Sequence, residues 1–521
     1  MSAHLRFLTL FLGLLHQVTL AEIKLPFLFT EGAVLQQQTG APIWGWAEAG
    51  QEVTVAFQGK NEHCEADENG YWKVTLNGLK ASSDPAELKI TAGEEELSLP
   101  GILVGEVWIA SGQSNMEWRL VDTQGGHHEV KTAQDPLLKV FTSANIAKAE
   151  PQKNWWGAWQ PTEPKKSGAF TAVGYYFAKE LRRELKVPVG IIECAWGGKP
   201  IASFISQESL AKLPEAAPLI ETKAKMIESW DPKVQQEKFE AAKKKFEKKM
   251  ALWKETQKGR KPRGPHRPVN PREDAWQHST IYHGMIAPQA GYGARGILWY
   301  QGEADARNGR AAIYSKMLKT LVADWRSQWG QPLSFYFVQL ANYKKPVEKP
   351  GTTHDWVTVQ NQMRIAYHQI EKSGIAIAND IGASDDIHPR NKQEVGKRLS
   401  LWALEKDYGI RQGLLTGPLF QEVRAAEKEG QKALAVSFHF GTGLKTRDGE
   451  APRHFEISGA EGEWHWAQAS IQGEEVVLSH PQVSEPRRVR YAWAQNPARA
   501  NLVNARGLPA SCFKAALPGA E

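Results

Sequence analysis

Cysteine is scarce in this sequence, whose 521 residues contain only Cys64, Cys194 and Cys512. Three thiols so far apart exclude a disulfide framework and a zinc site built on cysteine ligands. A single bridge between Cys64 and Cys512 would require the two end regions of the chain to touch, which spacing cannot show. Cys194 lies inside an apolar run, so we expect an inert core thiol there.

Long apolar runs are also lacking. Beyond the first 21 residues no stretch approaches the roughly 20 apolar residues of a spanning helix, so we expect no transmembrane segment. Residues 1–21 combine Arg6, a short apolar stretch from Phe7 to Leu15, and small residues before Ala21. This pattern predicts a secretory signal peptide cleaved near Ala21, and a secreted or periplasmic mature protein. The alternative is a buried first helix or strand.

An excess of one charge is confined to one segment. The formal net charge is +6, and residues 221–274 hold 16 basic and 9 acidic side chains, which leaves the remainder almost neutral. The segment lacks the interleaved aromatic residues that stack on bases, so we expect no nucleic-acid partner.

Tandem His127 and His128 have no carboxylate or cysteine set at ligand spacing. We therefore expect no metal and no cofactor.

Short alternating runs occupy the N-terminal part of the chain. Val53, Val55 and Phe57 alternate with polar residues, and Asn69-Gly70 is a turn signal before the next such run. This pattern predicts a small antiparallel β-sandwich, jelly-roll-like, over residues 22–100. Its functional alternative is a carbohydrate-binding module.

The rhythm changes after Gly105 to strands separated by helices. Continuous apolar runs at Val107–Ala110, Val189–Ala195, Ile297–Tyr300, Leu333–Leu340 and Ile375–Ile381 alternate with amphipathic stretches. Such a pattern predicts an α/β domain, over residues 101–411, with a parallel sheet covered by helices on both faces. Ligands in these sheets bind beyond the carboxyl ends of the strands.

Two further regions flank or interrupt this domain. In residues 207–272, Phe239, Phe246 and Trp253 recur every seven positions among Lys and Glu, which predicts a helical insertion on the surface. A lid, or an anchor for anionic glycans, is its functional alternative. From residue 412 to 521 short strand patterns return and predict a C-terminal β region.

The first apolar run of the domain ends in GQSNM, which places Ser114 directly after a core strand. A serine hydroxyl becomes a nucleophile only when a base accepts its proton. The segment SDDIHP supplies His388 and, three residues earlier, Asp385, whose spacing predicts that the carboxylate orients the imidazole. A helix N-terminal region is the alternative interpretation of these two residues. In α/β-hydrolases the acid and the histidine normally lie on separate loops, so the compact spacing favours another fold.

Four strand ends in this chain order, GQSNM, WGG, WYQGE and DIHP, resemble the SGNH hydrolase superfamily, and within it the sialate O-acetylesterase family of carbohydrate acetylesterases. The resemblance extends from about Leu28 to Lys514. It implies a flavodoxin-like parallel sheet flanked by N- and C-terminal β-sandwich-like regions that pack together.

The resemblance also assigns further residues to the site. It implies an oxyanion hole made from the backbone N–H of Ser114, a glycine N–H at Gly197 or Gly198, and the side-chain amide of Gln301, where the superfamily usually has an asparagine. Gln113, Asn115 and Glu303 are expected to support the site, Asn115 by bonding local backbone and Glu303 as a structural hydrogen-bonding residue.

Together these features predict a serine esterase that removes O-acetyl groups from a sugar or glycan, and the resemblance favours O-acetylated sialic acid. An esterase acting on acetylxylan or another polysaccharide shares every motif. A glycosidase with Glu303 and Asp385 as paired carboxylates would leave Ser114 and His388 without a role. A non-catalytic glycan-binding protein is the alternative from a different class.

Overall fold

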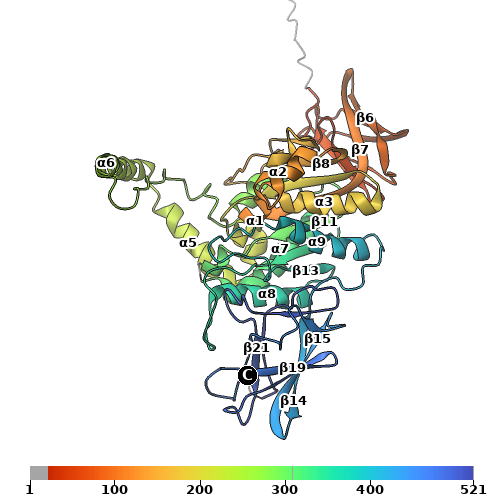
Figure 1. Ribbon diagram of the computed structural model, residues 1–521. Coiled ribbons are helices and arrows are strands. Elements are labelled where there is room, and N and C mark those ends of the chain that lie inside the picture. Colours follow the sequence, from red (N-terminus) through yellow and green to blue (C-terminus); the bar gives the residue numbers. More distant parts are fainter. Residues whose placement is uncertain (1–21, 308, 520–521) are drawn as a thin grey trace, which may run out of the picture.

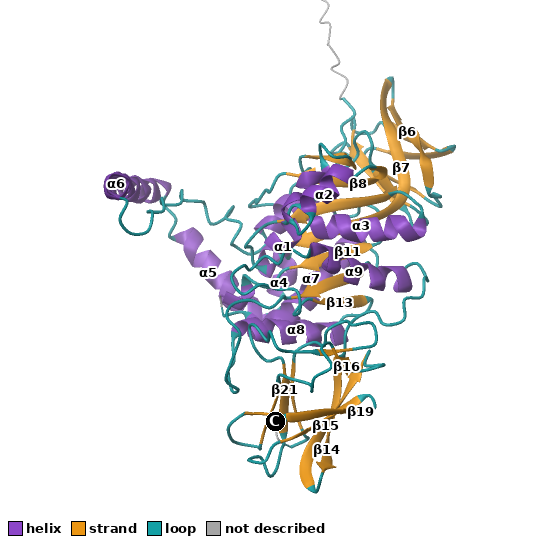
Figure 2. Ribbon diagram, in the orientation of Figure 1, coloured by secondary structure: helices purple, strands orange, loops and turns teal. Residues whose placement is uncertain are grey.

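The computed structural model describes residues 22–307 and 309–519 (Figures 1 and 2). The segment predicted to be a signal peptide lies outside these residues, so its cleavage and the export of the protein stay predictions. Among the residues described, none of the helices combines the length and apolar character that crossing a bilayer requires.

A mostly parallel sheet forms the centre of the molecule. Its strand order is β13-β12-β11-β7-β10-β8-β9, and only β9 runs antiparallel to its neighbour. The strands are β7 (Glu95–Gly112), β8 (Asp135–Ser143), β9 (Gly157–Thr162), β10 (Val189–Ala195), β11 (Gly296–Tyr300), β12 (Ser334–Gln339) and β13 (Ser373–Ile377). On one side of β7 the chain forms β8 and β9 first and then returns with β10 to the place next to β7; on the other side it builds outward from β11 to β13. The strand β7 is therefore a topological switch point.

Helices cover both faces of this sheet, as the sequence predicts. Trp108 of β7 contacts Phe177 of α3, while Trp299 of the neighbouring strand points to the opposite face and contacts Trp325 of α7. The principal helices are α3 (Ala172–Leu185), α7 (Tyr314–Trp329), α8 (Asp355–Gln369) and α9 (Lys392–Lys406). The helix α3 packs on α9, and α7 packs on α8. Because both faces are covered, the central strands are buried almost throughout.

The N-terminal β region shares a strand with the central sheet. The first half of β7 pairs with β6 (Ser82–Ala92) and β1 (Val34–Gln36), and β6 continues through β3 (Glu52–Phe57) to β4 (Lys60–Glu65). A separate pair is formed by β2 (Ala41–Trp46) and β5 (Tyr71–Leu76). The expected boundary after residue 100 falls inside β7, so the two regions are continuous through one strand.

The insertion contains α4 (Gln207–Ala211), α5 (Ala217–Glu228) and α6 (Pro232–Thr256), and Figure 1 shows α6 held away from the body of the molecule beyond α5. The expected stripe of Phe239, Phe246 and Trp253 is only half-buried. It packs on the chain that returns from the helix, where the Trp253 indole N–H donates to the Gly259 carbonyl at 3.2 Å.

The C-terminal β region has its own core and lies at the opposite end of the molecule from the N-terminal one (Figure 1). It is built from β14 (Leu419–Lys428), β15 (Gln431–His439), β16 (Lys445–Thr446), β17 (Phe455–Ser458), β18 (His465–Trp466), β19 (Gln468–Gln472), β20 (Glu475–Ser479), β21 (Arg488–Tyr491), β22 (Leu502–Val503) and β23 (Phe513–Ala516). The expectation that the two β regions pack together is therefore wrong. With the central sheet between them, Cys64 and Cys512 cannot meet, and both are free thiols.

Candidate active site

Ser114 stands at the carboxyl end of β7, where the sheet topology switches. Gly112 ends the strand with φ +135°, and a Cβ there would lie 2.2 Å from the Tyr300 carbonyl oxygen. Only glycine permits this approach of β7 to β11. The chain then turns, with the Gln113 N–H donating to the same carbonyl at 2.9 Å, and Ser114 begins the short helix α1 (Ser114–Glu117). The sequence thus presents the hydroxyl at the edge where α/β sheets bind ligands.

His388 reaches this serine from the loop before α9. Its imidazole Nε2 lies 2.9 Å from the Ser114 Oγ. The indole of Trp118 stacks on the ring, with centroids 4.7 Å apart and planes inclined by 20°. Burial lowers the pKa of His388, and nearby Lys392 acts in the same direction, so the ring is neutral at pH 7 and can accept a proton. The structure therefore brings together the serine and the histidine that the sequence singles out.

The carboxylate beside this histidine is Asp386, which corrects the expectation for Asp385. The Asp386 Oδ1 lies 3.3 Å from the His388 Nδ1 and accepts the His388 backbone N–H at 2.9 Å. Asp385 is exposed and takes no part in this contact. The expectation assumed a helical turn, in which residues three apart share a side. The segment is an irregular loop instead. The Asp386 carboxylate accepts the backbone N–H of the residue two positions later, as in an Asx turn, and this bond holds the carboxylate next to His388.

A pocket of about 410 Å³ opens over these side chains. This volume is in the range of sites that enclose a small molecule. The residues around it come from the ends of several strands and from the far end of the insertion: Gln113, Ser114, Gly198, Trp276, Glu303, Ala304, Arg307, Ile387 and His388. Ser114 and His388 therefore face a space that can hold a substrate.

Two backbone N–H groups beside the serine are available to an oxyanion. Within residues 22–307 and 309–519, neither the Ser114 N–H nor the Gly198 N–H has a protein partner. The Gly197 N–H, in contrast, donates to the Glu117 carboxylate at 2.6 Å. Of the two glycines expected to contribute, Gly198 lines the pocket with its donor unused and Gly197 has its donor committed.

Gln301 does not reach the pocket, which corrects its expected place in the oxyanion hole. Its side chain is fully buried, and its Nε2 lies 2.6 Å from the Asp305 Oδ2. Its Oε1 accepts from the Tyr314 hydroxyl at 2.8 Å. A hydrogen bond from the Gln301 amide to the charged Asp305 carboxylate is stronger than one to a neutral acceptor. Gln301 therefore holds the loop after β11 together.

Gln113 is the side-chain amide that does line the pocket. Its Oε1 accepts from the Ala304 N–H at 3.2 Å and lies 3.3 Å from the Gln301 Nε2. These two donors fix the orientation of the amide. Among the described residues its own Nε2 has no protein partner and is not fully enclosed. This arrangement leaves an amide donor in the pocket beside Ser114.

Asn115 connects three segments of the site. Its Nδ2 donates to the Glu303 Oε1 at 2.5 Å and to the Ile387 carbonyl at 3.1 Å, while its Oδ1 accepts from the Lys392 ammonium. The expectation that it bonds local backbone is therefore wrong, because its partners lie on the β11 loop, the histidine loop and α9. Glu303 accepts one of these bonds, and its role as a structural hydrogen-bonding residue stays a prediction. Asn115 thus holds the serine turn in register with His388.

Glu303 and Lys392, an acid and a base, are both buried and both bond to Asn115. Lys392 is fully buried and lies over the Trp118 ring at 5.8 Å and the Tyr300 ring at 5.3 Å. Burial lowers the pKa of Lys392 to about 7 and raises the pKa of Glu303, while the attraction between the two opposes both shifts. Such groups are costly to bury and are typical of functional sites.

Three residues of this site carried no signal in the sequence. Lys392 and Trp118 are isolated positions whose roles depend on which loops meet. Trp276 follows the insertion in sequence, yet it lines the pocket with 48% of its surface exposed. Its segment is anchored, since the Ser203 hydroxyl donates to the Ala275 carbonyl at 2.9 Å.

His127 and His128 lie exposed on α2 (Gly126–Thr132), and no group of three or more potential metal ligands occurs among the described residues.

Comparison with known proteins bears on this geometry. Residues 104–231 and 272–404, half of the chain, match the family described as carbohydrate esterase, sialic acid-specific acetylesterase. The two matched ranges contain Ser114 and His388, and they leave out most of the insertion. A carbohydrate acetylesterase of known structure from Xanthomonas citri is 31% identical, with a TM-score of 0.78, over 95% of this chain and 99% of that one.

Two characterised mammalian proteins are similar over most of their length. The sialate O-acetylesterase of Rattus norvegicus is 28% identical over 433 residues, which cover 75% of this chain and 74% of that protein. The sialate O-acetylesterase of Homo sapiens is 24% identical over 82% of this chain and 78% of that protein. The protein is a carboxylic ester hydrolase and belongs to the carbohydrate esterase family of sialic acid-specific acetylesterases.

Proposed function

We propose that this protein hydrolyses O-acetyl esters of sialic acid, with Ser114 as the nucleophile and His388 as the general base. The observation that carries the proposal is the 2.9 Å contact between the Ser114 Oγ and the His388 Nε2, at the floor of a pocket at the switch point of the sheet. The family and the named relatives support the acetyl ester as the bond that is cleaved.

The chemistry follows from this arrangement. The His388 Nε2 takes the Ser114 proton as the Oγ attacks the acetyl carbonyl. The imidazolium then gives that proton to the departing sugar oxygen, which leaves an acetyl-serine. Water, deprotonated by the same nitrogen, attacks the acetyl group, and the proton returns to the Ser114 oxygen as acetate leaves. Asp386 holds the Nδ1 proton, so that the Nε2 lone pair faces the serine.

Developing charge on the carbonyl oxygen needs donors that are already in place. We assign this role to the Ser114 and Gly198 N–H groups and to the Gln113 Nε2. All three belong to residues that line the pocket, and none has a protein partner among the residues described. The short helix α1 and the bond from Gln113 to Tyr300 hold the serine segment fixed.

The sugar is assigned from the charge at the mouth of the pocket. Arg307 lines it, and the ammonium of Lys199 lies 5.3 Å from the centre of the Trp276 ring. An exposed aromatic face stacks on a sugar ring, and the two cations suit the carboxylate of a sialic acid. The glycosidase alternative fits poorly, because Asp385 does not line the pocket. A neutral acetylated polysaccharide such as acetylxylan is the second candidate, favoured by the likeness to the carbohydrate acetylesterase.

Acetate release from two defined substrates tests the proposal. O-acetylated N-acetylneuraminic acid and acetylated xylo-oligosaccharides would be compared at equal acetyl concentration, with 4-nitrophenyl acetate as a measure of intact chemistry. We expect a higher kcat/KM on the sialic acid. A protein that is active on the aryl ester but prefers the xylan substrate would favour the second candidate. Activity retained by a folded Ser114→Ala variant would remove this serine from the mechanism, since loss of a nucleophile costs about 10⁴-fold or more.

A further inference from the structure

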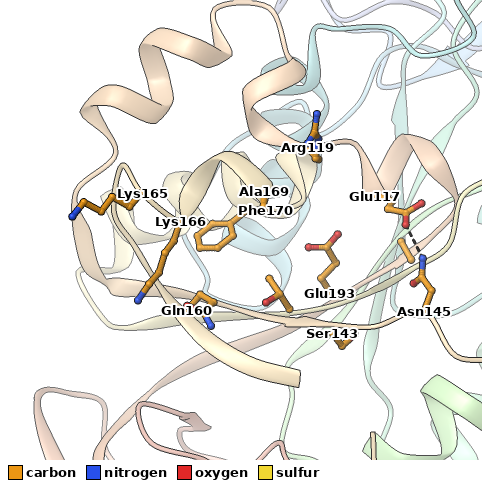
Figure 3. Close-up of a pocket in the computed structure, with 12 residues that line it drawn as sticks. Glu117, Arg119, Ser143, Asn145, Gln160, Lys165, Lys166, Ala169, Phe170 and Glu193 are labelled. Carbon is orange, nitrogen blue, oxygen red and sulfur yellow. Dashed lines mark hydrogen bonds between the residues drawn. The ribbon is translucent and has the colours of Figure 1, made fainter. Parts of the chain in front are cut away.

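A second cavity, of about 510 Å³, shares no lining residue with the catalytic pocket. Figure 3 shows the residues that line it. It opens at the carboxyl ends of β8 and β10, the same edge of the sheet that carries Ser114. Its size is in the range of sites that hold a small molecule. The proposed reaction makes no use of it.

The carboxyl group of Glu193 faces this cavity and has no ion-pair partner among the described residues. It belongs to β10, whose other residues are buried and without charge. Its Oε2 accepts the Thr171 N–H at 3.1 Å, and the structure gives its other oxygen no protein partner in the described part of the chain. Burial raises the pKa of Glu193 to about 8, and the Glu117 carboxylate acts in the same direction. The raised pKa favours the protonated form, which both donates and accepts hydrogen bonds, as a sugar hydroxyl does.

The walls of the cavity add complementary groups on two sides. Figure 3 shows Lys165, Lys166 and Gln160 on one side and Asn145 on the other, with Glu193 between them. The Gln160 amide has no side-chain partner within the described residues, and Lys166 contacts Glu163 at 3.2 Å. Amides and a neutral carboxyl group suit a ring with several hydroxyls, and the lysines suit a negative group on that ring.

Glu117 is the wall between the two cavities. Its Oε1 accepts from the Asn145 amide at 2.8 Å, and its Oε2 accepts from the Gly197 N–H at 2.6 Å. Gly197 in turn packs so tightly on the nucleophile that an added Cβ would lie 3.3 Å from the Ser114 Cβ. Glu117 and Gly197 therefore separate the second cavity from Ser114. A glycan whose acetyl ester lies at Ser114 can place its next residue in the second cavity.

We propose that this second cavity is an accessory subsite that binds the neighbouring, carboxylate-bearing sugar of an acetylated glycan. The inference rests on the proposed function, because it takes the acetylated sugar at Ser114 as given. It adds a preference for linked acidic sugars over the free monosaccharide. The residues that carry it are Gln160, Lys165 and Glu193, none of which belongs to the catalytic machinery.

Kinetics on three substrates test the subsite. They are 4-nitrophenyl acetate, free O-acetylated N-acetylneuraminic acid, and a disaccharide of two sialic acids acetylated on one of them. In the Gln160→Ala/Lys165→Ala variant we expect kcat/KM for the disaccharide to fall about 10-fold, the usual effect of losing hydrogen bonds to a charged group. The other two substrates should be turned over as in the wild type. The matched control is Gln236→Ala/Lys244→Ala on the projecting helix α6, which should change nothing.

Two outcomes would overturn the subsite: an unchanged kcat/KM for the disaccharide, or an equal fall for all three substrates. A wild-type protein that cleaves the aryl ester but neither sialic acid would instead contradict the proposed function. In that case binding decides. Calorimetric titration of the Ser114→Ala protein with the unacetylated disaccharide should show an affinity about 10-fold higher than with Gln160→Ala/Lys165→Ala added. Equal affinity, or equal binding of a neutral disaccharide, would reject the acidic subsite.

Discussion

The Asp386 Oδ1 contacts two groups of His388 at once: it lies 2.9 Å from the His388 backbone nitrogen and 3.3 Å from the imidazole Nδ1. The first bond fixes the carboxylate on the loop, and the second directs the imidazole. The acid, the base and the backbone between them therefore move as one unit. Because Trp118 stacks on the ring, the Nε2 is aimed at Ser114 before any substrate binds.

This relationship predicts which of two adjacent acids serves the histidine. Asp386→Asn should lower kcat/KM by about 100-fold, because an amide no longer stabilises the imidazolium that forms in the transition state. Asp385→Asn, the matched control one residue away, should leave kcat/KM close to the wild-type value. Steady-state kinetics on 4-nitrophenyl acetate, with circular dichroism as a check of folding, would measure both. The reverse order would return the role to Asp385.

The pH profile of kcat/KM should show an acid limb below pH 6.5, the usual pKa of histidine. Burial disfavours the charged imidazolium and lowers the pKa of His388, so the active neutral form persists to lower pH and activity is lost only as pH falls through this lowered pKa. Asp386 opposes the shift. Asp386→Asn should therefore move the acid limb to still lower pH, whereas a role confined to folding would leave it in place.

Lys392 should matter to both stability and catalysis. Lys392→Met removes the ammonium that faces Asn115, and it leaves Arg307 to oppose the raised pKa of the Glu303 carboxyl group without Lys392. We expect the free energy of unfolding to fall by about 3–5 kcal/mol, as when one partner of a buried charge pair is lost. Removal of this positive charge should also raise the pKa of His388 and move the acid limb to higher pH.

A double-mutant cycle tests this coupling. If the cost of Lys392→Met is an uncompensated buried carboxylate, then Glu303→Gln added to it should recover part of the lost stability. Urea denaturation of the wild type, the two single variants and the double variant gives the interaction free energy. Strictly additive effects would mean that Lys392 stabilises the site by packing on Trp118 and Tyr300 rather than through charge.

The fold could be predicted where strands and helices have clear periodicity. The apolar run Val189–Ala195 coincides with β10, and the runs predicted for β11, β12 and β13 agree with those strands within a few residues. The run Val107–Ala110 marks only the last part of β7. The strands β8 and β9 were missed, since they lie at one edge of the sheet and mix polar with apolar residues. The prediction that the two β regions pack together was wrong, because the order of elements along a chain does not determine which surfaces meet.

In the candidate site, too, some residues could be predicted from the sequence and others could not. Ser114 and His388 could be found because each follows a core strand and their chemistry requires one another. Asp386 could not be chosen over Asp385, since the choice depends on a local turn without periodicity. Gln301 was misplaced because its partner Asp305 competes for the amide within one turn of chain. Lys392, Trp118 and Trp276 become functional only through tertiary contacts, which no spacing reveals.

Trp276 gives the last prediction, because its position links the insertion to the choice of substrate. It follows residues 207–272 directly and lines the catalytic pocket with its ring half exposed, while Ala275 before it and His278 after it are buried. An aromatic ring held in this way loses little freedom on binding and offers a flat surface to a sugar.

Trp276→Ala should therefore raise KM for O-acetylated sialic acid by about 10-fold, the loss of a stacking contact, and should leave kcat nearly unchanged. Turnover of 4-nitrophenyl acetate should stay close to wild type, since Ser114 and His388 are untouched. Trp276→Phe keeps an aromatic face and should restore most of the affinity, whereas Trp156→Ala, which removes another exposed tryptophan, serves as the matched control. A fall in kcat on both substrates would instead mean that Trp276 supports the catalytic groups, and that the insertion shapes the chemistry as well as the recognition of the sugar.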